Sequence, residues 1–138
     1  MNHLYELKLE SNPQEVHRVE ALIKQISAEH HFSQAFLYDV MLLVTEATNN
    51  AILHGNKCNP TKNAFLKCLI KDDELFIEVK DEGSGFDPNN LPDPLAEENL
   101  LKPSGRGVFL MRQFSQEVNY SFSESGTTLK IKVPIQRS

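Results

Sequence analysis

The stretch from Ser33 to Asn56, SQAFLYDVMLLVTEATNNAILHGN, constrains the fold of this chain more than any other part. Its apolar residues recur at about 100° per residue, the spacing of one helix face. This stripe consists of Phe36, Val40, Leu43, Ala47 and Ala51, with Val44 on its flank. An apolar stripe of this kind packs against another layer of the protein. We therefore predict one long helix that follows the capping residue Ser33 and ends near Gly55.

Two polar residues share one shoulder of this stripe. Glu46 and Asn50 are four residues apart and are therefore neighbours on the helix surface, whereas Asn49 points about 100° away from Asn50. Taken singly, each is explained as a solvated surface residue. His54, in line with the centre of the stripe, is expected to be a core or capping histidine.

Strands are indicated wherever apolar and polar residues alternate. The predicted strands are Leu4–Leu9, Ala64–Lys71, Glu74–Lys80, one containing Val118, Tyr120 and Phe122, and one running from Leu129 to Ile135. Capping signals predict a first helix from Ser11 or Asn12 to about His30. A short third helix is predicted from Val108 to Phe114. This order lacks regular strand-helix alternation. We predict an α+β two-layer sandwich, with a mixed, mostly antiparallel sheet of about five strands and three helices on one face.

Two polar residues fall in phase with the buried positions of a strand. Asp81 continues the alternation of Leu75, Ile77 and Val79, and Thr127 begins that of the last strand. Both are expected to point inward. A carboxylate in such a place is unusual unless something pairs with it.

Composition limits the class of protein. The 138 residues, 40% of them hydrophobic, fit a single domain over residues 1–138. A net charge of −5 argues against direct nucleic-acid binding, which needs a basic face. The sequence shows no signal peptide and no apolar run long enough to span a membrane, and Cys58 and Cys68 are expected to remain thiols. A soluble cytoplasmic protein is the expectation.

Four glycine- and acid-containing motifs follow one another along the chain. They are Glu-x-x-x-Asn on the helix edge, Asp-x-Gly-x-Gly after a strand, Gly-x-Gly at a helix start, and Gly-Thr entering a strand. Together they indicate a nucleotide site. A phosphate loop of the GxxxxGK[ST] type is absent, and neither glycine pair extends to GxGxxG, because Pro88 and Leu110 occupy the third positions.

These motifs resemble the Bergerat-type ATP-binding domain shared by gyrase, the histidine kinases, the ninety-kilodalton heat-shock chaperone and the mismatch-repair ATPases. The matching stretches are EATNNAILHGN at 46–56, DEGSGF at 81–86, GRGVFLM at 105–111 and GTTLKI at 126–131. The EAxxNAxxHG and KPSGRGVFLM forms of two of these boxes look like those of the anti-sigma-factor serine kinases.

The resemblance implies a role for each matching residue. Asn50 would ligate Mg²⁺, Glu46 would orient or deprotonate the attacking hydroxyl, and Asp81 would accept the adenine amino proton, supported by Thr127. The other nucleotide-binding positions implied are Gly83, Gly85, Phe86, Gly105, Arg106, Gly107 and Val108. Residues 88–103 would form a lid over the nucleotide.

The function implied by the resemblance is that of an ATP- and Mg²⁺-dependent serine kinase acting as an anti-sigma regulatory factor. Its partners would be a small STAS-type anti-sigma-factor antagonist, a sigma factor and a second copy of the chain, with no direct contact to nucleic acid or membrane. One alternative is a non-catalytic ATP-binding module that controls a partner by binding alone. Two others are the kinase core of a two-component system and a structural domain without nucleotide. No phospho-accepting helix precedes the first predicted strand, which disfavours the two-component reading.

Overall fold

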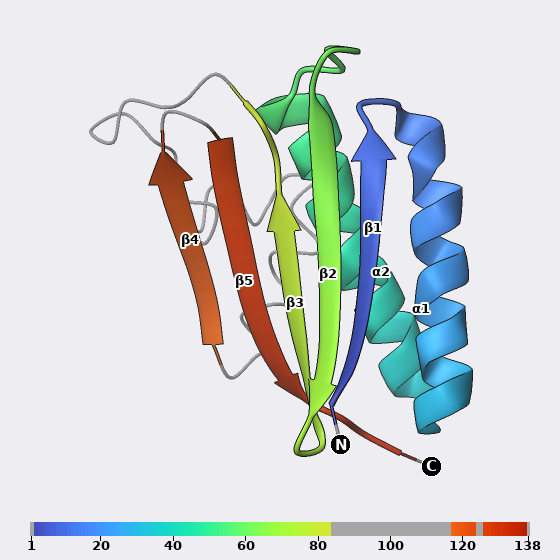
Figure 1. Cartoon of the computed structure of the whole chain (residues 1–138). Helices are drawn as coiled ribbons and strands as arrows, with labels where there is room; N and C mark the ends of the chain where they lie inside the picture. The colour runs from blue at the N-terminus through green and yellow to red at the C-terminus, as the bar shows by residue number, and fades with distance from the viewer. Residues whose placement is uncertain (1, 84–116, 124–125, 138) are drawn as a thin grey trace.

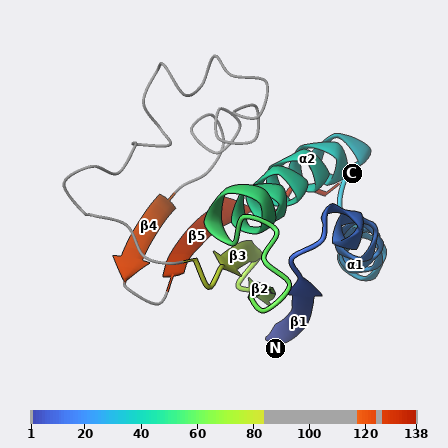
Figure 2. The ribbon, with the colours of Figure 1, turned by 90° about the horizontal axis from the view of Figure 1, so that it is seen from above.

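The described part of the chain forms a five-stranded sheet with two helices packed on one face. The computed structural model describes residues 2–83, 117–123 and 126–137. The strands are β1 (His3–Glu10), β2 (Asn63–Lys71), β3 (Glu74–Lys80), β4 (Glu117–Ser123) and β5 (Gly126–Pro134), and the helices are α1 (Val16–His30) and α2 (Gln34–Asn50). Figures 1 and 2 show both helices on the same side of the sheet. The predicted α+β two-layer architecture is confirmed.

The four strand pairings among the described residues are all antiparallel, and the strand order is β1-β2-β3-β5-β4. The sequence predicts a mixed, mostly antiparallel sheet. The antiparallel pairing is confirmed, and the described strands include no parallel pair. The predicted third helix, residues 108–114, lies outside the described residues. No helix in the described part of the chain is long and apolar enough to cross a membrane.

The core lies between the sheet and the helices. Phe36, Leu43 and Ile23 from the helices meet Leu66, Ile77 and Ile131 from the strands, and all six are at most 2% exposed. Burying a side chain of this size stabilises a protein by about 1.5–3 kcal/mol. The apolar stripe recognised in the sequence is therefore the face that fixes α2 to the sheet.

Capping side chains start both helical segments where the sequence predicts. Ser33 Oγ accepts a hydrogen bond from the backbone N–H of Phe36 at 3.1 Å, and Asn12 Oδ1 accepts one from Gln14 at 3.0 Å. The first segment is not one continuous α-helix, however, because a short 3-10 turn at Pro13–Glu15 precedes α1. Proline has no N–H to donate, so it is tolerated in such a first turn.

The long helix predicted to run to Gly55 changes character near its end. After Asn50 the chain continues as a π-helix, Ala51–Gly55, and the N–H of Asn56 reaches back five residues to the carbonyl of Ala51 at 2.8 Å. This wider turn rotates the following residues away from the apolar stripe. His54 is exposed, so its expected place in the core is wrong, although it does lie in the last turn of this segment.

Candidate functional site

The site forms where α2, β3 and β5 end or begin together, at the upper end of the sheet in Figure 1. Glu46 and Asn50 lie in the last two turns of α2, and both side chains are partly buried. The π-helix follows them directly. Single π turns inside helices are frequently found at functional sites.

Asp81 is the buried carboxylate of this site, with an exposed fraction of 5%. It follows the last residue of β3, and its N–H donates to the carbonyl of Thr127 at 2.9 Å. Its Oδ1 atom accepts two backbone hydrogen bonds, from Gly83 and from Thr127, both at 3.0 Å. The inward orientation predicted for Asp81 is confirmed. The second carboxylate oxygen, Oδ2, lies against Gly55.

Three glycines pack against this carboxylate. A Cβ atom added to Gly55 would lie 2.0 Å from Asp81 Oδ2, and one added to Gly126 would lie 2.0 Å from the Asp81 carbonyl oxygen. A Cβ on Gly83 would meet the Gly55 carbonyl at 2.5 Å. These contacts show that the end of the helix segment carrying Glu46 and Asn50 touches the carboxylate directly.

Thr127 lies on the other side of Asp81 at the start of β5 and is 9% exposed. The predicted inward orientation of its side chain is confirmed. Its Oγ1 atom is buried and has no hydrogen-bond partner among the described residues. A buried hydroxyl without a partner costs free energy, and a bound ligand beside Asp81 would remove that cost.

Asn56, which has no site role in the sequence analysis, links three segments at this point. It is 2% exposed. Its Nδ2 donates to Ser11 Oγ at 3.0 Å, and its Oδ1 accepts from the N–H of Glu82 at 2.8 Å. Ser11 Oγ in turn donates to the Lys62 carbonyl at 2.6 Å. Asn56 thereby ties the end of the π-helix to the residue that follows Asp81.

The sequence signals for these missed residues are weak. Gly55, Asn56 and Gly126 all lie within the motif stretches, at 46–56 and 126–131, but the sequence assigns none of them a role of its own in the site. The remaining predicted nucleotide positions lie outside the described residues; they are Gly85, Phe86, Gly105, Arg106, Gly107 and Val108, together with the lid at 88–103.

Two pairs of polar residues lie at the two ends of this region. Asp81 Oδ2 and Thr127 Oγ1 provide a buried acceptor and hydroxyl at one end, and Glu46 and Asn50 lie about 8–14 Å farther back along the helix, at about 1.5 Å per residue from Gly55. No group of three His, Cys, Asp or Glu side chains in the described residues could hold a metal ion. A Mg²⁺ ion at Asn50 would therefore take its other ligands from phosphate and water, as this ion commonly does.

Sequence comparison identifies the family of this chain. The model of the histidine kinase-like ATPase domain matches residues 9–133. The chain therefore belongs to the histidine kinase-like ATPase domain family. An ATP-binding domain is the class of protein that the fold and family define.

Within that family the chain is similar to anti-sigma factors. It is 34% identical over 99 residues to the anti-sigma F factor of Shouchella clausii, covering 70% of this chain and 68% of the relative. The anti-sigma F factors of Oceanobacillus iheyensis and Bacillus subtilis are each 30% identical over 105 residues, covering 74% of this chain and 72% of the relative.

Solved structures share the fold. The RsbU and RsbW domains of Rv1364c from Mycobacterium tuberculosis superpose with a TM-score of 0.66 at 15% identity, covering 99% of this chain and 34% of that chain. The histidine kinase domain of the Erythrobacter litoralis EL346 blue-light activated kinase gives a TM-score of 0.61 at 19% identity, covering 89% of this chain and 64% of that chain.

Proposed function

We propose that this chain is an ATP- and Mg²⁺-dependent protein serine kinase that acts as an anti-sigma regulatory factor. It phosphorylates a small STAS-type antagonist protein, sequesters a sigma factor and works as a homodimer in the cytoplasm. The family match supports ATP binding, and the names of the relatives support the anti-sigma role. The observation that carries the nucleotide site is the buried Asp81, with Oδ1 fully engaged by backbone amides and Oδ2 left beside Gly55.

The two polar residues of α2 have separate tasks in this proposal. Asn50 supplies one neutral oxygen to the Mg²⁺ that accompanies ATP. Glu46, one helical turn earlier, orients the serine hydroxyl of the antagonist and accepts its proton. A bond forms between the serine oxygen and the γ-phosphorus as the bond to the β,γ-bridging oxygen breaks, and ADP leaves. Positioning and charge stabilisation supply most of the rate in such transfers.

The kinase activity is tested by replacing Glu46. The Glu46→Gln variant and wild type are incubated with Mg-ATP and a purified candidate antagonist, and phosphoserine is measured by mass spectrometry. We expect a loss of rate of about 10²- to 10⁴-fold, because a positioned proton acceptor typically contributes this much. The affinity for ATP, measured by calorimetry, should stay unchanged.

A matched control is Glu20→Gln on α1, where a carboxylate is replaced outside the site. This variant should phosphorylate the antagonist at the wild-type rate. If Glu46→Gln does so too, Glu46 has no catalytic role. If wild type binds ATP but yields no phosphoserine with an antagonist that it demonstrably binds, the chain regulates by binding alone.

A further inference from the structure

His54 lies next to the candidate site but takes no part in the proposed phosphoryl transfer. The phase of an unbroken α-helix would place it at the centre of the apolar stripe, yet its side chain is exposed. Its imidazole makes no hydrogen bond, ion pair or ring contact within residues 2–83, 117–123 and 126–137. The ring therefore has its donors available for a ligand.

The π-helix determines the side of the helix on which His54 lies. In an α-helix four residues turn about 400°, so positions 46, 50 and 54 would drift by about 40° each toward the apolar stripe. The hydrogen bond from the Asn56 N–H to the Ala51 carbonyl closes a wider turn instead. A turn that encloses more residues rotates less at each residue, so the drift is cancelled. His54 consequently stays in line with Glu46 and Asn50 on their shoulder of the helix.

Along the helix axis, His54 lies between the two ends of the site. It is about 6 Å beyond Asn50, at about 1.5 Å per residue. It directly precedes Gly55, where an added Cβ would lie 2.0 Å from Asp81 Oδ2. In the proposed complex the adenine lies at Asp81 and the Mg²⁺-bound phosphates lie at Asn50. The part of the nucleotide between these two groups is the ribose with the α-phosphate.

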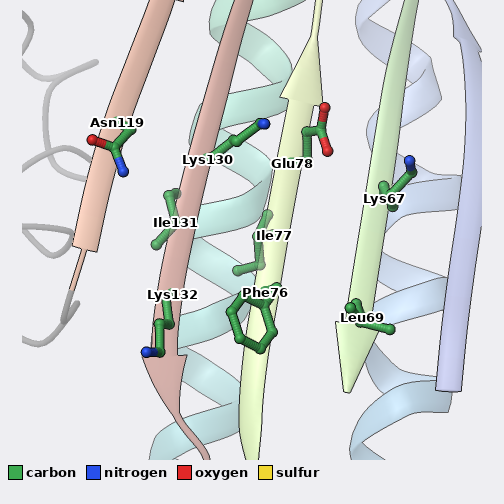
Figure 3. Close-up of a pocket in the computed structure, with 9 residues that line it drawn as sticks. All are labelled: Lys67, Leu69, Phe76, Ile77, Glu78, Asn119, Lys130, Ile131 and Lys132. Atoms are coloured by element: carbon green, nitrogen blue, oxygen red, sulfur yellow. The ribbon is translucent and has the colours of Figure 1, made fainter. Parts of the chain in front are cut away.

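A phosphate at this place needs a donor from the protein. The site lies at the C-terminal end of a helical segment, where backbone carbonyls carry partial negative charge, and Glu46 and Asp81 add two carboxylates. Three lysines of the neighbouring strands project from the other face of the sheet, around the hollow shown in Figure 3; they are Lys67, Lys130 and Lys132. His54 is the basic residue in the last turn of the π-helix, and an imidazole has an N–H donor in either protonation state.

We propose that the His54 imidazole donates a hydrogen bond to the α-phosphate of the bound adenine nucleotide. The inference rests on the proposed ATP site and adds a protein donor to it. The α-phosphate stays with ADP and is not a reacting group, so the contact is the same before and during phosphoryl transfer. Such uniform binding lowers KM and leaves kcat unchanged. His54 is therefore a nucleotide-binding residue, with an effect that differs from that of Glu46.

The His54→Ala variant tests this contact with a series of ligands. Calorimetry gives the affinities of variant and wild type for ATP, ADP and AMP, and competition against ATP gives that for adenosine. We expect His54→Ala to bind ATP, ADP and AMP each about tenfold or more weakly, because hydrogen bonds to charged groups are among the stronger ones. Its affinity for adenosine, which has no phosphate, should equal that of wild type. With Mg-ATP and the antagonist, KM for ATP should rise by the same factor while kcat is retained.

His54→Gln and His54→Asn keep an N–H donor, and at least one of them should recover part of the lost affinity. The matched control is His17→Ala, which removes an exposed imidazole from α1 and should bind all four ligands as wild type does. An equal loss for adenosine, a loss confined to ATP, unchanged affinities, or no recovery in either donor-bearing variant would each overturn the contact. A wild type that binds no ATP would contradict the proposed function itself, and the contact with it.

Discussion

Asp81 is held by backbone amides and by the close approach of glycines. The N–H groups of Gly83 and Thr127 fix one carboxylate oxygen, and Gly55 leaves just enough room for the other. The position of Oδ2, the oxygen that we propose accepts the adenine amino proton, is therefore set by contacts with the main chain.

Replacing Gly55 by alanine should damage the site selectively. The added Cβ would lie 2.0 Å from Asp81 Oδ2, so the carboxylate must turn away from its present position. We expect Gly55→Ala to weaken ATP binding by roughly tenfold or more, because a buried ligand group left unpaired costs about 1–3 kcal/mol. Calorimetric titration measures this, with the exposed Leu53→Ala in the same π-helix as the control. Equal affinities of Gly55→Ala and wild type would show that this close contact is unimportant.

Asn56 should matter for stability because its side chain joins three segments. In Asn56→Ala the N–H of Glu82 loses its acceptor and Ser11 loses a donor. Leaving such buried groups unsatisfied typically costs about 1–3 kcal/mol. Urea unfolding followed by circular dichroism gives the change, with Asn59→Ala in the exposed loop as a milder comparison. A free energy of unfolding equal to that of wild type would contradict the structural role of Asn56.

At the scale of elements, the β2–β3 hairpin turns without glycine. Strand pairing leaves only Asp72 and Asp73 in the loop, and both have positive φ, at 53° and 61°. A two-residue hairpin loop of this kind matches the right-handed twist of the strands but favours glycine at its second position. The sequence spacing predicts the hairpin, and the strained backbone is visible only in the structure.

Asp73→Gly should stabilise the protein by about 0.5–1 kcal/mol, because an L-residue pays for left-handed backbone that glycine adopts freely. The substitution also removes the ion pair from Asp73 to Arg137 at 3.0 Å, but Asp73 is 82% exposed and such pairs contribute little. Thermal unfolding of Arg137→Ala, which loses the ion pair alone, and of Asp73→Gly, which also relieves the backbone strain, separates these two effects. A lower melting temperature for Asp73→Gly than for Arg137→Ala would contradict this explanation.

The contact between β1 and α1 should make stability depend on pH. The Tyr5 hydroxyl donates to Glu29 and lies 3.0 Å from His30 Nε2. Burial, together with the bond to Glu29, raises the pKa of Tyr5 to about 12. Burial and the nearby His3 lower the pKa of His30 below 6.5. Both shifts favour the neutral forms in the folded protein.

Because the pKa of His30 is lowered and that of Tyr5 is raised, the free energy of unfolding should be highest at pH values between the two titrations. A lowered His30 pKa means that the unfolded chain binds the proton more tightly, so stability falls as the pH drops below about 6.5. The raised Tyr5 pKa means that stability is lost as the pH rises from about 10 to about 12. Urea unfolding across this pH range measures the loss of stability at acid and at alkaline pH. In Tyr5→Phe the free energy of unfolding should depend less on pH between about 10 and about 12. An alkaline limb unchanged in Tyr5→Phe would rule out this assignment.

For the whole molecule, periodicity in the sequence was enough to predict the layers and the burial of particular residues. The stripe of α2 and the phase of Asp81 and Thr127 follow from spacing alone, because helix and strand periods decide which side chains face the core. The exposure of His54 could not be predicted, because it depends on a π turn that leaves no periodic signal. The contacts of Asn56 join residues far apart in the chain, and a single sequence does not show which distant segments meet.

The central claim is that the chain holds an adenine nucleotide at Asp81, and calorimetric titration of ATP and GTP tests it most directly. Wild type should bind ATP at least roughly a hundredfold more tightly than GTP, because a site built to accept the adenine amino proton strongly rejects a base without it. Asp81→Asn can keep its Oδ1 contacts while presenting an amide in place of Oδ2, so it should stay folded and lose ATP affinity. Equal binding of ATP and GTP by wild type, or ATP binding by Asp81→Asn as tight as that of wild type, would contradict the claim.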